Sequence, residues 1–359
     1  MKIKSVIVLG LGKVGSLVAT LLHKTGFEVT GADRYAKDNL PFPAITIDMA
    51  DTESLSDAIK NFDAVMSCLP YSYNIDLAKI AHTLAIHYFD LTEDVPTTKA
   101  IIQMSKTANS VMAPQCGLAP GFIAIVGASL ASKFTKIRSI KLRVGALPKN
   151  PTGLLGYAFN WSPEGVVNEY LNDCEVIENG QHKWISPMEW VEQLFINGIH
   201  LEAFTTSGGL GTMCETYLGK VENLDYKTIR YPGHVKQMNF FFHELLMRED
   251  RKLAGRILTN AKPPVNEDVV YVHASVEGLQ ETYLFREEFV NAYYPINIDG
   301  QWWRAISWTT AASACAVIEM VSNGILPDKG FIKQEDISLS DFFKTRNGRL
   351  YRGEPHGGI

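Results

Sequence analysis

The sequence predicts an α/β protein in which a doubly wound parallel sheet is interrupted by an inserted α+β domain. Short apolar runs alternate with helical segments in the first third of the chain, and longer β-like runs follow. Residues 302–323 then return to helical periodicity with small side chains. We therefore expect residues 1–122, completed by 302–359, to form one domain and residues 123–301 to form the other.

The first domain is expected to consist of repeated β-α-β units. Residues 3–9 are mostly apolar, as in a parallel strand covered on both faces, and residues 14–24 carry apolar side chains at helical spacing. The segments between the later strands are long enough for right-handed crossover helices. Further strands are expected at 27–32, 44–48, 62–69, 86–91 and 110–113, with helices at 52–60, 74–84 and 96–108.

The second domain is expected to be built around a largely antiparallel sheet. Its β-like runs are longer, and passages rich in glycine and proline separate them. The helix at 302–323 is expected to return to the first domain, and residues 331–359 are expected to form a loosely docked terminus. The long β runs cover residues 137–147, 174–185, 269–277 and 281–290.

Composition excludes several classes of protein. Hydrophobic residues make up 46% of the chain, and 34 Lys and Arg against 39 Asp and Glu give a net charge of −5, which argues against a nucleic-acid partner. The most apolar long stretch, 117–132, is broken by proline and glycine, so no membrane partner is expected. The five cysteines are scattered without a CxxC pair, which indicates reduced thiols in a cytoplasmic protein.

A glycine loop follows the first strand and opens the first helix. In the sequence Gly10-Leu11-Gly12-Lys13-Val14-Gly15, Gly10 permits the turn, Gly12 lets the backbone approach a pyrophosphate, and Gly15 lets the helix pack on the strand. The phosphates would lie at the helix N-terminus, beside Lys13 and Val14. This pattern is typical of a Rossmann-type dinucleotide-binding domain, and a tight turn without a ligand is the alternative.

The end of the second strand bears on the choice of cofactor. Asp33 would accept hydrogen bonds from the adenosine ribose and repel a 2′-phosphate, which favours NAD. Arg34 would stack on adenine, help to hold a 2′-phosphate, or lie in solvent, so NADP stays possible. Leu69 and Pro70 end another strand and are expected to lie over the cofactor, with Tyr71 towards the substrate; ordinary packing is the alternative for each.

Several longer blocks make the chain similar to a known family. The glycine loop, 67–71, 88–91 and 117–122 resemble the saccharopine dehydrogenase family, and the blocks 159–165, 201–209 and 226–234 resemble its lysine-oxidising and saccharopine-reducing members. The resemblance covers most of residues 1–325. It implies a Rossmann domain with an inserted α+β domain, and oxidation of a C–N bond in a lysine-derived amine by a nicotinamide cofactor.

Such a reaction indicates which side chains to look for. An arginine would hold the carboxylate of an amino-acid substrate, and a base would accept a proton from its amine. We assign these roles to Arg230 and His234, which flank a Tyr-Pro-Gly turn, with a capping role as the alternative for His234. Asp90 is a third catalytic candidate, and Arg143 is next if these fail. Trp161 and Ser162 are expected to form a pocket wall and a polar contact, with a core aromatic as the alternative for Trp161.

Two functional classes remain. The first is an NAD(P)-dependent dehydrogenase or reductase acting on CH–NH or CH–NH2 groups of a small amino-acid substrate. The second is a nucleotide-binding sensor of the same fold that has lost catalysis, and an oxidoreductase for another amine is a further alternative. The chain lacks clustered metal ligands and a G-x-S-x-G elbow, so neither a metal site nor a serine hydrolase is expected. The long β runs of the second domain are expected to support a homodimer.

Overall fold

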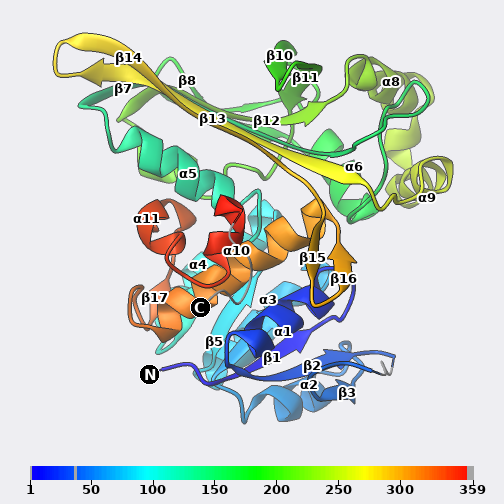
Figure 1. The fold of residues 1–359 in the computed structure, drawn as a ribbon, viewed down its shortest axis with the longest axis vertical. Coiled ribbons are helices and arrows are strands. Elements are labelled where there is room, and N and C mark those ends of the chain that lie inside the picture. The colour runs from blue at the N-terminus through cyan, green and yellow to red at the C-terminus, as the bar shows by residue number, and fades with distance from the viewer. Residues whose placement is uncertain (1, 36–38, 354–359) are drawn as a thin grey trace. The chain divides into compact units, whose positions relative to one another are not determined.

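The chain divides into two compact units in the computed structural model, which describes residues 2–35 and 39–353 (Figure 1). The first unit comprises Met1–Ile125 and Ser307–Ile359, and the second comprises Val126–Ile306. The second unit is therefore an insertion between the two parts of the first. The boundaries expected from the sequence, after residues 122 and 301, lie a few residues before those observed.

A sheet of parallel strands forms the centre of the first unit, in the order β17-β6-β5-β4-β1-β2-β3. From β3 to β6 this is the order of dinucleotide-binding sheets, which bind ligands at the carboxyl ends of the strands where the order reverses, here between β1 and β4. The expected parallel sheet is confirmed, and β17 is an addition that the sequence did not predict. The strands are β1 (Ser5–Leu9), β2 (Glu28–Asp33), β3 (Ala44–Thr46), β4 (Ala64–Ser67), β5 (His87–Asp90), β6 (Val111–Ala113) and β17 (Gly330–Phe331).

Helices connect these strands, and their ends carry recognisable caps. The Asp51 carboxylate accepts hydrogen bonds from two amides at the start of α2, and Asp94 does the same for one amide of α4, which also has Pro96 in its first turn. Both helices therefore begin close to where their caps predict. The helices are α1 (Gly15–Lys24), α2 (Thr52–Ile59), α3 (Asn74–Thr83), α4 (Val95–Ser105), α10 (Ala305–Ser322) and α11 (Leu339–Phe342).

Helix α10 is a longer apolar stretch than the sequence led us to expect. Its 18 residues have a mean hydropathy of 1.3, which is enough by length and composition for a membrane span, but 89% of that stretch is buried inside the protein. A buried helix of small side chains is what a core position requires. The expected helix over 302–323 begins only at Ala305, because Trp302 and Trp303 belong to a short strand, β16 (Gln301–Trp303), paired with β15 (Ile296–Ile298).

The C-terminal segment is docked, contrary to expectation. The Tyr351 ring stacks on Phe122 with 3.9 Å between ring centroids, and its hydroxyl donates to the Thr309 carbonyl at 2.5 Å. The Asn347 backbone amide donates to the Glu319 carboxylate at 3.0 Å. Apolar stacking and buried hydrogen bonds thus fix this segment as far as residue 353. Residues 354–359 lie outside the described part of the chain.

The second unit has a mixed sheet in the order β10-β11-β12-β7-β13-β14, with β8 and β9 attached to β12. Only the β7–β12 pair is parallel; the other pairs are antiparallel. The expected strand at 174–185 is two strands, because Asn179 and Gly180 have φ angles of +53° and +74° and form a tight hairpin turn. The strands are β7 (Lys136–Pro148), β8 (Cys174–Glu178), β9 (Gln181–Ile185), β10 (Glu192–Ile196), β11 (Ile199–Thr205), β12 (Val221–Arg230), β13 (Asp268–Gln280) and β14 (Tyr283–Tyr293).

Short helices complete the second unit. A cluster of buried side chains from this region includes Tyr157, Tyr170 and Phe204, and it packs around the C-terminal part of β12. Polar side chains inside such a cluster need hydrogen-bond partners, which the next section describes. The helices are α6 (Pro163–Leu171), α7 (Met213–Tyr217), α8 (His234–Asn239), a π-helical turn (Phe240–Glu244) and α9 (Arg251–Ala261), and α5 (Phe122–Ala131) carries the chain into this unit.

Candidate active site

The glycine loop has the shape that a pyrophosphate needs. Gly10 has a φ of +87°, a conformation that favours glycine, and a Cβ on Gly15 would lie 1.8 Å from the Gly10 carbonyl oxygen. Gly12 is exposed, and a Cβ there would meet nothing within 4 Å. No side chain caps the N-terminus of α1. The loop therefore fits a dinucleotide, which Gly10, Gly12, Lys13, Val14 and Gly15 would hold through backbone amides.

Asp33, the last residue of β2, forms a hydrogen bond with the glycine loop. Its Oδ2 atom accepts a hydrogen bond from the Leu11 amide at 2.7 Å. Arg34 is exposed and forms an ion pair with Asp48 at 2.9 Å, so its guanidinium is engaged beside the loop. A solvated ion pair of this kind is worth little, and it leaves Arg34 able to exchange partners.

Leu69, Pro70 and Tyr71 follow β4, next to the point where the strand order reverses. Leu69 and Tyr71 are half-buried, Pro70 is exposed, and Tyr71 begins a short 3-10 helix. A ligand at the carboxyl ends of β1 and β4 would therefore meet these three residues, which remain cofactor and substrate candidates.

Asp90 has a different role from the catalytic one expected. It is fully buried at the end of β5, and its carboxylate accepts hydrogen bonds from the Tyr88 hydroxyl (2.7 Å), the Thr92 amide (2.9 Å) and the Gln115 amide (3.0 Å). Burial raises the pKa of Asp90 to about 6. Because these donors surround a carboxylate without solvent access, Asp90 orders the loops after β5 and β6, and direct contact with a substrate does not fit.

Arg230 and His234 do lie together, joined by a residue that the sequence analysis missed. Arg230 Nε donates to the Tyr170 hydroxyl oxygen at 2.8 Å, and that hydroxyl lies 3.0 Å from His234 Nε2. His234 Nδ1 lies 2.8 Å from the Leu155 carbonyl oxygen. A carbonyl only accepts, so Nδ1 carries the proton and Nε2 accepts from Tyr170.

This arrangement contradicts the assignment of His234 as the general base. His234 is 1% exposed, both ring nitrogens are engaged, and burial, assisted by the charge of Arg230, lowers its pKa to about 3. Glu202 explains its placement, because the Glu202 carboxylate accepts from the Gly233 and Val235 amides at 2.9 and 2.8 Å and fixes the start of α8. His234 thus positions Tyr170, and through Tyr170 it positions Arg230.

Trp161 and Ser162 lie at the start of α6. Trp161 is half-buried against the cluster around Tyr170, and its Nε1 donates to the Tyr157 hydroxyl at 3.2 Å. The Ser162 hydroxyl accepts from the Gly165 amide at 3.1 Å and so caps α6. The Tyr157 ring lies under the Arg230 guanidinium, 4.6 Å from ring centroid to Cζ. Trp161 therefore supports the wall that holds Arg230, while capping already accounts for Ser162.

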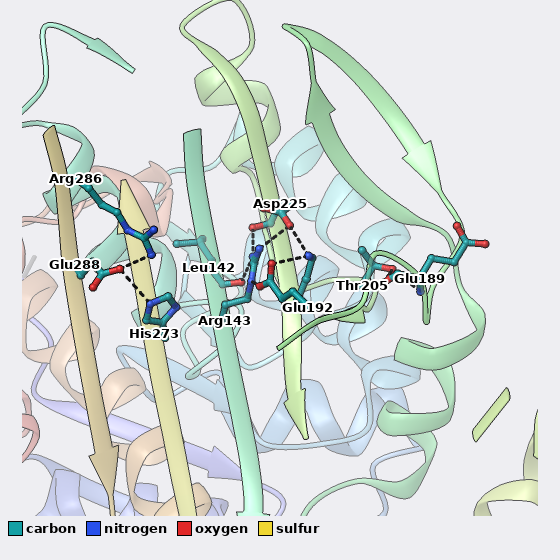
Figure 2. Close-up of polar contacts among 10 residues, drawn as sticks. Leu142, Arg143, Glu189, Glu192, Thr205, Asp225, His273, Arg286 and Glu288 are labelled. Carbon is teal, nitrogen blue, oxygen red and sulfur yellow. Dashed lines mark hydrogen bonds and ion pairs between the residues drawn. The ribbon is translucent and has the colours of Figure 1, made fainter. Parts of the chain in front are cut away.

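Arg143, the reserve candidate, belongs to a buried charge network. Figure 2 shows its guanidinium between Glu192 and Asp225, and Lys227 Nζ reaches Glu192 at 2.9 Å. Arg143 Nη2 lies 2.8 Å from Asp225 Oδ2, and Arg143 is 1% exposed. Two cations thus face two carboxylates across β7, β10 and β12. Arg143 is satisfied within the protein and is no substrate ligand.

Tyr170 and Glu202 help to position Arg230 and His234, and the sequence did not indicate either residue. Tyr170 lies on a helix whose other apolar residues pack in the core, so nothing in the spacing distinguishes it. Glu202 was part of a block similar to the family but carried no assigned role. Among the described residues, no group of three or more His, Cys, Asp or Glu side chains could hold a metal ion, and all five cysteines are free thiols.

The sheet order, the glycine loop and the inserted unit define a dinucleotide-binding α/β protein with a second domain. The family model for the saccharopine dehydrogenase NADP binding domain matches residues 6–115, and the one for the saccharopine dehydrogenase C-terminal domain matches residues 117–350. The chain belongs to the saccharopine dehydrogenase family. This confirms the resemblance seen in the sequence, while the family model indicates NADP where Asp33 favoured NAD.

Individual relatives share only modest sequence identity with this chain. A saccharopine dehydrogenase [NADP(+), L-glutamate-forming] from Pyricularia oryzae is 26% identical over 194 residues, 50% of this chain and 43% of that protein. An alpha-aminoadipic semialdehyde synthase from Arabidopsis thaliana is 27% identical over 174 residues, 44% of this chain and only 16% of that protein. Both matches therefore cover less than half of the relative's length.

A solved structure supports the fold over nearly all of the chain. The apo saccharopine dehydrogenase (L-Glu forming) from Saccharomyces cerevisiae superposes with a TM-score of 0.75, covering 95% of this chain and 97% of that one. The two sequences are 16% identical, so the likeness concerns the fold. It confirms the α/β fold class expected from the sequence.

Proposed function

We propose that this protein is an NAD(P)-dependent oxidoreductase that acts on the C–N bond of a lysine-derived amine such as saccharopine or lysine. Both family models support this assignment, as do the activities named for the relatives. The substrate is accordingly a small amino acid. In this reaction the amine loses a hydride to the nicotinamide and becomes an imine, and in the reverse direction the imine gains the hydride.

The observation that carries the proposal is the surroundings of Arg230. This side chain is 2% exposed, and among the described residues it forms no ion pair with a carboxylate. Its Nη1 atom donates to the Ile229 carbonyl at 2.8 Å, and its Nε is used by Tyr170. A buried arginine normally has an anionic partner. The buried Glu169 carboxylate raises the pKa of Arg230, and a substrate carboxylate would supply the directly bonded anionic partner.

The chain's own residues then have distinct tasks. Arg230 binds the carboxylate, the Tyr157 ring supports its guanidinium, and Tyr170 with His234 fixes the direction of its Nε–H. Burial raises the pKa of the Tyr170 hydroxyl, which therefore stays protonated and keeps donating to His234. When bound at the glycine loop, the nicotinamide cofactor would accept or donate the hydride.

Replacing Arg230 with methionine is expected to weaken substrate binding. The loss of a charge-assisted hydrogen bond of about 1.5–3 kcal/mol corresponds to a roughly 10–100-fold increase in KM. NADPH formation from saccharopine and from lysine measures this, and the dissociation constant of NADP should stay unchanged. R138M is the matched control, since Arg138 is a surface residue of the same unit. A wild-type KM in R230M would show that the substrate carboxylate binds elsewhere.

The alternative is a nucleotide-binding sensor of the same fold. A sensor would bind the dinucleotide at the glycine loop and would turn over no amine. A screen of amines and 2-amino acids with NAD and NADP at alkaline pH, followed by the reverse reaction with 2-oxoglutarate, separates the two. Dinucleotide binding without turnover of any of them would favour the sensor.

The preference between NAD and NADP is expected to depend on the charge of Asp33. In D33N the amide oxygen can still accept from the Leu11 amide, while the negative charge that repels a 2′-phosphate is gone. The affinity for NADP should rise roughly tenfold, about 1.4 kcal/mol. Fluorescence titration with NADPH and NADH checks this. Unchanged affinity for NADPH would place the adenosine ribose away from Asp33.

We also propose that the protein is cytoplasmic and that it forms a homodimer. The edge strand β14 pairs only with β13 among the described strands and exposes Tyr283, Phe285 and Val290. An exposed apolar edge of this length is normally covered. Light scattering at micromolar concentration should give twice the monomer mass of 39.9 kDa, and the mass should fall towards the monomer in F285E. A wild-type monomer would exclude the dimer.

A further inference from the structure

A polar cleft of about 550 Å³ lies within the second unit, and neither the fold nor the proposed reaction accounts for it. Its walls come from the end of α6, the segment between β9 and β10, the π-helical turn, and the start of α9. The volume suits a small metabolite. The charged side chains in its lining are Asp173, Glu189, Arg248 and Arg251.

These charges do not neutralise one another. Arg251 Nη1 donates to the side-chain oxygens of Asn168 and Asn172, both at 2.8 Å, and Arg248 Nη1 contacts His243 Nδ1 at 3.1 Å. All of these partners are neutral acceptors. Within the described part of the chain, Asp173 and Glu189 likewise form no ion pair, so two cations and two carboxylates face one cleft without meeting.

Hydrogen bonds in the walls hold the Arg251 guanidinium and the Glu189 backbone in place. The two asparagines fix the Arg251 guanidinium from one side. In the segment between β9 and β10, the Ser186 and Glu189 carbonyls accept from the Thr205 hydroxyl, which in turn accepts from the Glu189 amide at 3.1 Å. Figure 2 shows the Glu189 carboxylate pointing away from the other labelled side chains. Charged groups on ordered walls lose little freedom on binding a ligand.

The backbone beside the cleft is unusual as well. Met188, Trp190 and Leu246 have φ angles of +59°, +49° and +56°, although none is a glycine. The π-helical turn that supplies His243 is a rare element that is frequent at functional sites. Conformations of this kind are costly and persist where the surroundings impose them.

From this arrangement we propose that the cleft binds a free α-amino acid in its dipolar form. Arg251 and Arg248 bind the carboxylate, and Asp173 and Glu189 bind the ammonium group. Each half of the ligand thus meets side chains of opposite charge that form no ion pair with any described residue. Tyr170, whose hydroxyl accepts from Arg230, also lines the cleft, but the four charged side chains do not include Arg230, so the site does not depend on the proposed oxidoreduction.

Isothermal titration of the full chain, without dinucleotide, tests the site. The probes are L-glutamine and L-alanine, with acetate and ethylamine as the two halves of the ligand. We expect an amino acid to bind with a dissociation constant of about 1 mM or lower, and each half alone to bind at least about tenfold more weakly. R251Q and D173N should each weaken amino-acid binding at least about tenfold.

R256Q is the matched control, because Arg256 lies on the same helix and does not line the cleft. It should bind the amino acid like the wild type, and so should R230M. The proposal is overturned if no amino acid binds, if acetate binds as well as the amino acids do, or if R251Q and R256Q behave alike. Loss of binding in R230M with retention in R251Q would move the ligand to the proposed active site.

Discussion

Replacing Arg143 with methionine is expected to lower the free energy of unfolding by about 3–5 kcal/mol. The side chain is 1% exposed and forms ion pairs with Glu192 and Asp225. Without it, the buried Lys227 alone faces the carboxylates of Glu192 and Asp225. Methionine has a similar length, so the loss measures the uncompensated charge and not a cavity.

A matched control separates burial from the mere presence of an ion pair. Arg138 lies on the same strand and pairs with Glu277 at 2.8 Å, but its side chain is 58% exposed. R138M should therefore cost no more than about 1 kcal/mol. Urea unfolding followed by circular dichroism measures both variants. Equal losses would mean that the buried network contributes no more than a surface pair.

The wild-type protein is expected to lose stability in acid because of His234. Burial lowers the pKa of this imidazole to about 3, against 6.5 for an ordinary histidine. Below pH 6.5 the unfolded chain takes up a proton that the folded protein does not, so unfolding becomes easier as the pH falls towards 3. The slope is about 1.4 kcal/mol per pH unit, or about 2 kcal/mol between pH 6.5 and 5.0.

The variant H234Q isolates this contribution. A glutamine amide can donate to the Leu155 carbonyl and accept from Tyr170, but it does not titrate. Asp90 acts in the opposite sense, because burial raises its pKa to about 6, so its contribution to stability is lost as the pH rises from about 4 through 6. The difference between wild type and H234Q cancels Asp90. Parallel stability curves for the two proteins between pH 5 and 7 would refute the prediction.

Local signals in the sequence were strong enough to predict the first unit. Alternating apolar runs, caps such as Asp51 and Asp94, and the spacing from Gly15 to Asp33 each depend on neighbours in the chain. The second unit depends on pairing at long range. Strand β7 joins β12 in parallel and β13 in antiparallel fashion, and nothing near residues 136–148 encodes those partners.

The candidate site shows the same division. Arg230 and His234 were found because they flank one turn, but their connection passes through Tyr170, which is about sixty residues away in the sequence. The roles of Asp90 and Arg143 also changed for one physical reason. A charged residue looks equally reactive in a sequence whether protein donors surround it or a ligand does, and only the fold distinguishes the two.

The split of the first unit has a consequence for how the protein is made. Strand β17 pairs Gly330 with Val111, and helix α10 brings its buried apolar residues to the same unit after the whole second unit has been synthesised. On the ribosome, the nascent first unit therefore carries an open sheet edge at β6 and an uncovered apolar surface while the inserted unit already has all of its strands. Such an intermediate is a natural substrate for chaperones.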